Sequence, residues 1–323
     1  MLGERRGRGD RAGRGEAIVN GIANARPAAH DRAELYAALD MFVDGLLARD
    51  PARVRWADRV AFTENNVALM IGEGIWNTIT GRGDYDLRFA EPLTGQVGLF
   101  TTVIETRDES AFTLRLGVID GAIAEVEMVV VRDADEALKF PDPRFWTKPV
   151  LEEIVAPAER VSRERMVAIA NGYFSTLECN DGTILTSFHP HADRVENGVR
   201  TTNNPAFFVP VAALGCEEQF RLGYYRYDDR LRGRRFPLVD EERGLVMAGG
   251  FIDHRGVLGD YTLTDGRQVS SPIRRPHTFY LLELFKIRAG AIEQIEANFI
   301  TVPYHMPSPW DDRRQGGEGP CTS

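Results

Sequence analysis

Two stretches far apart in the chain follow the same pattern of residues. One, RAELYAALDMFVDGLLARDPARVRWADRVAFTENNV, starts at Arg32, and the other, RERMVAIANGYFSTLECNDGTILTSFHPHADRVENGV, starts at Arg163. Each begins with apolar residues at helical spacing, passes through a polar break and ends in an extended segment. After a one-residue slip, Glu64-Asn65 aligns with Glu196-Asn197. A chain that carries one pattern twice is expected to fold as two similar units.

Both stretches should open with an amphipathic helix. Asp31 with Glu34 in the first repeat, and Ser162 in the second, are typical N-cap residues. The residues spaced to form one apolar face are Leu35, Leu39, Phe42 and Leu46 in the first repeat and Met166, Ile169, Tyr173 and Leu177 in the second.

A second pair of matching stretches lies downstream. FTLRLGVIDGAIAEVEMVVV starts at Phe112 and FYLLELFKIRAGAIEQIEANFIT at Phe279, and each predicts a strand, a glycine-containing turn and another strand. Glu127 in the first aligns with Glu296 in the second. The second repeat is longer before this hairpin, so we expect an insertion within residues 205–275. GYYRYDDRLRGRRF and AGGFIDHRGVLGDYTLTDGRQ are interpreted as its extra hairpin or lid material.

These patterns predict an α+β chain of two domains. The Arg/Gly-rich N-terminus and the polar C-terminus are interpreted as flexible tails. Four prolines in KFPDPRFWTKPVLEEIVAPAER indicate a linker. The expected division is a tail at 1–30, a first domain at 31–139, a linker at 140–160, a second domain with its inserted hairpin or lid at 161–310, and a tail at 311–323.

Composition excludes several function classes. The formal charge is −9, from 39 basic and 48 acidic residues, and the body of the chain has no long basic run, which argues against nucleic-acid and membrane partners. The 3 cysteines lack a C-x-x-C spacing, which favours a reducing cytoplasm. Walker, G-x-S-x-G and dinucleotide-binding motifs are absent from the sequence. A small molecule is the expected partner.

The repeated elements resemble a known superfamily. The order of helix, polar break, short apolar segment, strand with the pattern (W/F)xxxxxFTEN and hairpin with the pattern DGxIxxxEM is similar to the SnoaL-like branch of the nuclear transport factor 2-like superfamily, here in tandem over about residues 31–135 and 161–303. The resemblance implies two cone-shaped α+β barrels, each a curved antiparallel sheet wrapped on N-terminal helices. It also implies a pocket inside the cone and, because convex sheets of this type commonly pair, a homo-oligomer.

The same resemblance implies a chemistry. Members include ketosteroid isomerases, scytalone-type dehydratases, polyketide cyclases and lyases that release formaldehyde from lignin-derived compounds. A carboxylate in such a pocket loses water, which raises its pKa toward neutrality, so it can exchange protons without a cofactor. The expected function is therefore a cofactor-independent lyase or isomerase that acts on a hydrophobic or aromatic small molecule. A non-catalytic binding or scaffold protein is the alternative from another class.

The motif FHPHADRVENGV raises a third possibility. His189, His191 and Glu196 fit H-x-H-x4-E, the first half of a cupin metal motif, and residues two apart on a strand point the same way. None of the downstream histidines stands in a cupin second motif, and Asn203 occupies the place of an expected glycine. We expect no metal and no cofactor. Structural histidines, catalytic histidines and a metal-dependent cupin-like enzyme all remain open.

The second repeat is richer in suitable side chains, so we expect it to be catalytic and the first to be structural or substrate-shaping. In the predicted elimination, Glu196 or a histidine removes a proton, a tyrosine or histidine donates one, and Asn197 or Asn203 holds an oxygen. The predicted catalytic residues are Glu196, His189, His191, His277 and Tyr280. The predicted substrate-binding residues are Asn197, Asn203, Asn204, Tyr224, Tyr225, Glu296, Asn298, Glu64 and Asn65.

Each of these residues also has a plain structural interpretation. Glu64 and Glu196 can make strand-end hydrogen bonds, and Glu127 and Glu296 can face outward from the sheet. The tyrosines near position 225 can serve as lid packing.

Overall fold

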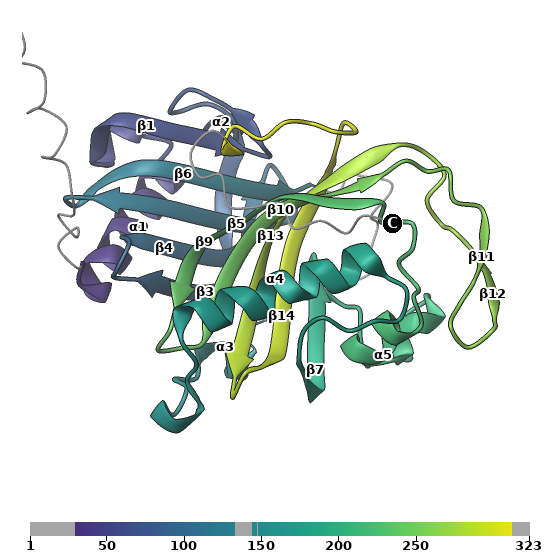
Figure 1. The fold of residues 1–323 in the computed structure, drawn as a ribbon. Helices are drawn as coiled ribbons and strands as arrows, with labels where there is room; N and C mark the ends of the chain where they lie inside the picture. The colour runs from purple at the N-terminus through teal and green to yellow at the C-terminus, as the bar shows by residue number, and fades with distance from the viewer. Residues whose placement is uncertain (1–29, 133–143, 147, 312–323) are drawn as a thin grey trace, which may run out of the picture.

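The structure, a computed structural model, describes residues 30–132, 144–146 and 148–311. Its elements form two sets in similar order (Figure 1). The first set is α1 (Arg32–Ala48), η1 (Pro51–Arg53), β1 (Trp56–Glu64), β2 (Val67–Ala68), α2 (Ile75–Thr78), β3 (Ile79–Glu91), β4 (Gln96–Glu105), β5 (Asp108–Ile119) and β6 (Ala122–Val131). Short helices α3 (Pro149–Glu152) and η3 (Pro157–Glu159) follow.

The second set is longer. It consists of α4 (Arg163–Cys179), β7 (Phe188–Glu196), β8 (Val199–Arg200), η4 (Pro210–Ala213), α5 (Cys216–Arg221), β9 (Arg230–Asp240), β10 (Leu245–His254), β11 (Asp260–Thr262), β12 (Gln268–Ser270), β13 (His277–Arg288) and β14 (Ala291–Val302). Both expected tails lie almost entirely outside the described residues, as do residues 140–143 and 147 of the expected linker. No helix in the described part of the chain is long and apolar enough to cross a bilayer.

Each set forms a six-stranded sheet, and the two sheets have the same topology. The strand order is β2-β1-β6-β5-β4-β3 in the first and β8-β7-β14-β13-β10-β9 in the second. The pairs β1–β6 and β7–β14 are parallel and the other pairs are antiparallel. Glu64 pairs with Met128 and Glu196 with Ala297, which confirms the alignment of the repeats. The chain is α+β with two similar curved sheets.

The two long helices form where the sequence predicts them. Asp31 accepts a hydrogen bond from the backbone of Ala33, and Glu34 accepts one from the backbone of Asp31, so α1 begins with a capping box. The Ser162 hydroxyl accepts the amide of Arg165 at the start of α4. The apolar face of each helix is buried against its own sheet.

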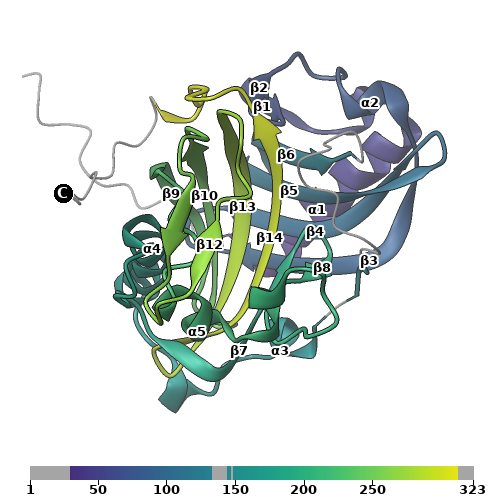
Figure 2. The same cartoon turned by 90° about the vertical axis from the view of Figure 1, so that its right-hand side faces the viewer.

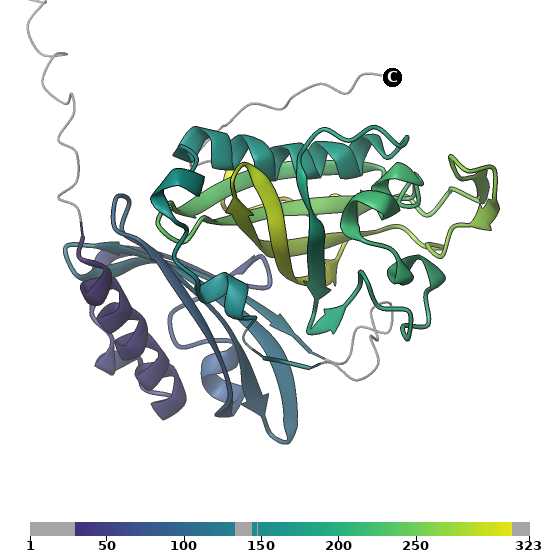
Figure 3. The ribbon, with the colours of Figure 1, turned by 90° about the horizontal axis from the view of Figure 1, so that it is seen from below.

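The two sheets pack against each other, and the helices cover their far sides. Seen from below, the order of layers is α1, first sheet, second sheet and α4 (Figure 3). β14 lies beside β6 (Figure 2), and β9 lies beside β3 (Figure 1). The shared apolar layer between the sheets contains Phe89 and Phe100 from the first and Leu282 and Leu284 from the second. The homo-oligomer was predicted because sheets of this type commonly pair. Here the two sheets of one chain pack against each other.

Contacts between the halves are reciprocal. Arg32 at the start of α1 forms an ion pair with Asp240 at the end of β9, at 2.6 Å. Arg163 at the start of α4 forms the matching ion pair with Glu91 at the end of β3. This exchange of equivalent contacts is the pattern of an isologous dimer interface, here formed between two repeats of one chain.

The extra residues of the second repeat fall in two segments. One, residues 201–229, contains η4 and α5 and precedes β9; the other, residues 255–276, contains β11 and β12 and follows β10. The inserted segments are shorter than predicted, because RLRGRRF and AGGFIDH form parts of β9 and β10, the counterparts of β3 and β4. The charged residues and glycines in these two stretches obscured the apolar pattern of two core strands.

Candidate active site

In each sheet, an equivalent row of neighbouring residues crosses the strands on the side that faces the helix. In the first repeat the row runs from Glu64 through large apolar residues, which are Met128, Leu114 and Leu99. In the second repeat the same row runs from Glu196 through Ala297, Glu283 and Ala248. The second repeat therefore keeps the scaffold but replaces the apolar filling of this row with a second carboxyl group between two small residues.

Two further core positions also change from an apolar side chain in the first repeat to a polar one in the second. Phe42 of α1 corresponds to Tyr173 of α4, and Phe62 of β1 corresponds to Arg194 of β7. Both second-repeat side chains are buried. A buried guanidinium is costly unless it is paired and hydrogen-bonded, so its presence in a position that tolerates phenylalanine points to a specific role.

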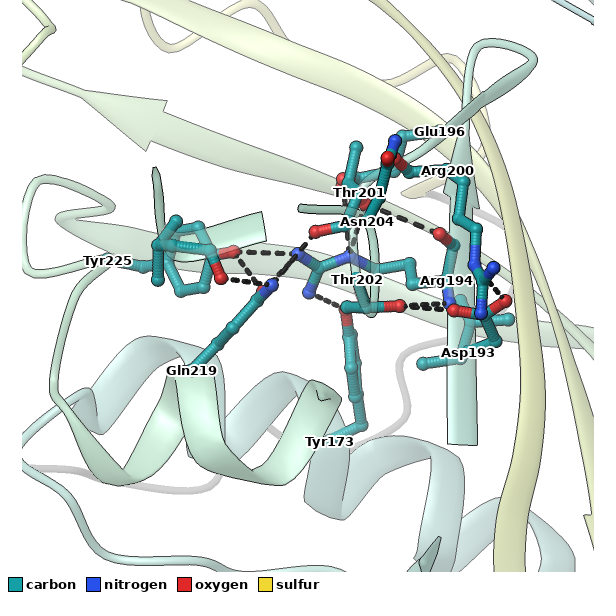
Figure 4. A network of polar contacts seen from close by, with 12 residues as sticks. Tyr173, Asp193, Arg194, Glu196, Arg200, Thr201, Thr202, Asn204, Gln219 and Tyr225 are labelled. Carbon is teal, nitrogen blue, oxygen red and sulfur yellow. Dashed lines mark hydrogen bonds and ion pairs between the residues drawn. The ribbon is translucent and has the colours of Figure 1, made fainter. Parts of the chain in front are cut away.

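Arg194 is the centre of a buried polar network (Figure 4). Its terminal nitrogens donate to Gln219 Oε1 at 2.8 Å, to the Tyr225 hydroxyl at 2.7 Å and to the Tyr173 hydroxyl at 3.3 Å. Its Nε lies 3.2 Å from a carboxylate oxygen of Glu196. We call Tyr173, Arg194, Glu196, Gln219, Tyr225 and Glu283 the Arg194 cluster.

The two carboxyl groups of the Arg194 cluster differ in protonation. Glu196 is partly exposed and forms the ion pair with Arg194. Glu283 is only 4% exposed. Burial, and then the neighbouring Glu196 carboxylate, raise the pKa of Glu283 to about 8, although Arg194 opposes the shift. At neutral pH the cluster thus holds one ion-paired and one neutral carboxyl group.

A histidine and an aspartate meet near the same interior. His254 at the end of β10 is fully buried, and its Nε2 lies 2.9 Å from Asp228 Oδ1. Burial raises the pKa of Asp228, while the hydrogen bond to His254 opposes this; the charges of Glu196 and Arg194 also act on Asp228. The dyad and the Arg194 cluster are therefore close enough to interact electrostatically.

Tyrosines connect these two groups. Tyr225 contacts Arg194 and lies with its ring centroid 6.1 Å from that of Tyr227, which in turn stacks on His254 at 6.4 Å. Tyr224 is an edge-on neighbour of Tyr225 at 5.4 Å, and its carbonyl accepts the hydroxyl of Tyr261 from β11. The predicted Tyr225 thus lies at the Arg194 cluster, and the half-buried Tyr224 packs beside it.

His277 lies at this interior and Tyr280 does not. The His277 ring stacks on His254 with centroids 4.6 Å apart, and its Nδ1 lies 2.9 Å from the carbonyl of Arg275. Tyr280 points to the opposite face of β13, where its hydroxyl donates to Glu127 between the two sheets. Strand alternation explains the difference, because residues an odd number apart face opposite sides.

Glu296 and Asn298 share one strand face, as predicted, but that face packs against the first sheet. Glu296 accepts hydrogen bonds from the Tyr85 hydroxyl at 2.6 Å and from Lys148 at 2.7 Å. The Asn298 amide donates to the hydroxyl of Thr113 at 2.8 Å. Both residues therefore connect the two repeats and do not point toward the Arg194 cluster.

The asparagines after the two Glu residues extend the sheet. Asn197 donates to the carbonyl of Phe299 and accepts its amide, at 3.1 and 2.9 Å. Asn65 makes the same pair of bonds with Val130 in the first repeat, and both asparagines have positive φ. Each side chain thus replaces a strand residue where the backbone turns away. This shared geometry explains the repeated asparagine by folding.

Asn203 and Asn204 stabilise the turn after β8. The Asn203 amide donates to the carbonyl of Ala192 at 3.1 Å, and the Asn204 amide donates to the carbonyl of Arg200 at 2.9 Å. Asn203 also adopts a positive φ of 47°. The Asn203 amide also donates to the Asp193 carboxylate at 3.3 Å, so both amide groups are occupied by contacts within the fold.

His189 and His191 are exposed on β7, with ring centroids 5.6 Å apart. His189 Nδ1 accepts the backbone amide of His191 at 3.2 Å. Among residues 30–132, 144–146 and 148–311, no three His, Cys, Asp or Glu side chains are arranged to hold a metal ion. Glu196 points to the Arg194 cluster and does not complete a set of ligands with these histidines.

In the first repeat the corresponding interior is filled by aromatic rings. Phe42 packs edge-on against Trp56 at 6.1 Å and Trp76 at 5.6 Å. Glu64 accepts the backbone amide of Ile75 at 2.7 Å and pairs with Arg132 at 2.9 Å. Glu64 thus makes the strand-end hydrogen bond that was the alternative to substrate binding.

Several residues of the site were not predicted from the sequence. These are Arg194, Gln219, Asp228, His254, Glu283 and Tyr173, which was predicted only as an apolar helix residue. A signal was present for three of them. Comparing the repeats position by position turns Phe42 into Tyr173, Phe62 into Arg194 and Leu114 into Glu283, each a polar replacement of an apolar core residue. Asp228 and His254 have no such signal, because contact between them depends on the inserted segments.

A small apolar pocket lies elsewhere in the second repeat, lined by Phe174, Leu231, Arg234, Gly250, Phe251 and Leu281. It contains none of the predicted site residues. Its only titratable group, Arg234, is paired with Glu178. We therefore place the candidate site at the Arg194 cluster, where the titratable groups converge.

Comparisons with known proteins give a family match and distant structural matches. The model of a domain of unknown function, DUF8021, matches residues 159–299, less than half of the chain. No curated protein matches. A protein of unknown function with a cystatin-like fold from Methylobium petroleophilum PM1 has 13% identity and a TM-score of 0.30, covering 35% of this chain and 85% of that one.

Two further solved structures are similar over one part of the chain. AclR, a proposed hydroxylase from Streptomyces galilaeus, has 19% identity and a TM-score of 0.28, covering 38% of this chain and 94% of that one. A de novo designed protein with a curved β-sheet has 14% identity and a TM-score of 0.26, covering 31% and 87%. At these scores none of the matches indicates a function for this chain.

Proposed function

We propose that the interior of the second repeat is the active site of a cofactor-independent lyase or isomerase that acts on a hydrophobic, aromatic small molecule. The observation that carries the proposal is the pair of carboxyl groups on one row of the sheet. Glu196 forms an ion pair with Arg194, and burial raises the pKa of Glu283 to about 8, so Glu283 holds its proton at neutral pH. Two carboxyl groups whose environments separate their pKa values can serve as base and acid in one reaction.

The positions of these groups suit an elimination. Glu196 and Glu283 are on strands that flank β14, and Ala297 lies between them with only a methyl group. Strand spacing separates the two backbones by roughly 10 Å. A substrate carbon above Ala297 would have a base on one side and an acid on the other.

The proposed steps balance without a cofactor. Glu196 takes a proton from a carbon of the substrate, and the electron pair of that C–H bond forms the new double bond. The leaving oxygen takes the proton of Glu283, so water departs. The positive charge of Arg194 stabilises negative charge that develops on a substrate oxygen. In an isomerisation the same two groups would remove a proton and return it at another carbon.

The aromatic walls support an aromatic substrate. Tyr224, Tyr225 and Tyr227 pack on one another between Arg194 and His254, and Phe279 packs edge-on against His254. Rings of this kind bind other rings by stacking and edge-on contacts. In this proposal the first repeat, with its filled interior, supports the second through the shared sheet interface.

The test is turnover by a variant that keeps the shape of the base. Aromatic diols and ketones would be screened by mass spectrometry for loss of water or formaldehyde, and kcat measured on the best of them. Glu196→Gln should lower kcat by at least ~10²-fold, the usual scale for general acid–base catalysis. Glu217→Gln is the matched control, because Glu217 forms an exposed ion pair with Arg221 on α5.

Unchanged turnover in the Glu196→Gln protein would remove Glu196 from the mechanism. Stoichiometric capture of a compound without product would instead support the non-catalytic binding protein.

A further inference from the structure

His254 is a buried side chain with one nitrogen in use and one available. Nε2 faces Asp228 Oδ1 at 2.9 Å, and in the neutral tautomer that donates to this carboxylate Nδ1 is left as an acceptor. Nδ1 is buried and has no hydrogen-bond partner among the described residues. A buried acceptor that is left unsatisfied lowers the stability of the fold, so such an atom calls for an explanation.

The ring of His254 is also held in one orientation. His277 stacks on it with an interplanar angle of 17°, and Tyr227 lies nearly parallel at 28°. Phe279 packs edge-on at 4.6 Å. With Asp228 fixing Nε2 and other rings covering its faces, the ring cannot easily turn to satisfy Nδ1. A side chain fixed in this way is preorganised for a ligand.

We propose that His254 Nδ1 accepts a hydrogen bond from the hydroxyl group of a phenolic ligand, whose ring packs among the surrounding aromatic side chains. The inference rests on the proposed function, because it names the substrate class of the same interior. A hydroxyl group supplies the missing donor. A planar ring matches the neighbours of His254, which are Tyr227, His277 and Phe279.

The proposed ligand position also relates the His254–Asp228 pair to the Arg194 cluster. Asp228 is within the electrostatic influence of Glu196 and Arg194. A ligand anchored by its hydroxyl at His254 would extend past Tyr227 and Tyr225 toward the Arg194 cluster. In this arrangement His254 positions the ligand and the two carboxyl groups act on it.

The test compares two probes of nearly equal shape, phenol and toluene, by isothermal titration calorimetry with the full chain. One neutral hydrogen bond of about 1 kcal/mol corresponds to roughly five- to tenfold tighter binding of phenol. His254→Phe keeps a ring for stacking and should abolish this preference. His305→Phe is the matched control, because His305 is 52% exposed and contacts Asp253 from outside, so the preference should remain.

Equal binding of the two probes to the unchanged protein, no binding of either, or a preference that survives His254→Phe would each overturn the proposal. If His254→Phe does not fold, ¹⁵N NMR of the unchanged protein decides. Phenol and not toluene should shift the Nδ1 resonance of His254, and an unchanged resonance would overturn the proposal. Because binding is measured without turnover, Glu196→Gln should keep the phenol preference even where it abolishes product formation.

Discussion

The pH dependence of stability should reveal the proton on Glu283. This carboxyl group has a pKa near 4.5 in the unfolded chain and about 8 in the folded protein. Between these values the folded state binds more protons, so stability falls as pH rises. One proton of difference corresponds to about 1.4 kcal/mol per pH unit, and the fall lessens as pH reaches the folded pKa. From pH 6 to pH 8 this group should therefore remove about 2 kcal/mol of unfolding free energy.

Glu283→Gln is neutral at every pH and keeps the shape of the protonated acid. Urea unfolding at pH 6 and pH 8 should show a loss in the unchanged protein that is about 2 kcal/mol larger than the loss in this variant. Other groups that titrate are present in both proteins, so their effects cancel in the difference. Glu217→Gln, on the surface of α5, should behave like the unchanged protein. Identical pH dependence in Glu283→Gln would refute the assignment of a buried, protonated carboxyl group.

Three other substitutions test the remaining buried contacts by urea unfolding. Arg194→Met should lower the free energy of unfolding by about 3–5 kcal/mol, because it leaves Glu196 without its counter-ion and several buried acceptors without a donor. A loss below about 1 kcal/mol would contradict a central role for Arg194. Glu127 binds two buried arginines that hold its pKa at about 2, so Glu127→Gln should cost about 3–5 kcal/mol at pH 7. That cost should shrink as pH falls from about 4.5 toward 2, where the unchanged protein also protonates this group; a cost independent of pH would argue against it. Asn197→Ala and Asn65→Ala should each cost about 1–3 kcal/mol, since each loses two hydrogen bonds to a strand; a loss in only one would show that the repeats differ here.

The repeat was the part of the fold most open to prediction. Two capped helices, the Glu-Asn strand ends and the glycine-turn hairpins are local patterns, and their alignment agrees with the register of both sheets. The pairing of the two sheets face to face was not predicted. Side chains such as Glu127, Glu296 and Tyr280 alternate on strands whose outer faces looked exposed, and only the second repeat covers those faces.

The site was harder to predict than the fold, for a physical reason. The Glu-Asn motif drew attention to Asn197, yet that asparagine is repeated because a strand ends there. Chemistry in the second repeat comes from positions where it departs from the first, such as Arg194 and Glu283. The contact between Asp228 and His254 joins an inserted segment to a strand end, and no local pattern indicates a contact of that kind.

The central claim, that Glu283 supplies a proton beside the base Glu196, is tested most directly by the pH dependence of kcat/KM on the first compound the protein converts. The acid must hold its proton, so kcat/KM should fall above about pH 8, approaching a tenfold loss per pH unit. A profile that stays level or rises to about pH 10 would contradict the claim, because Glu283 would by then have lost the proton that the mechanism requires.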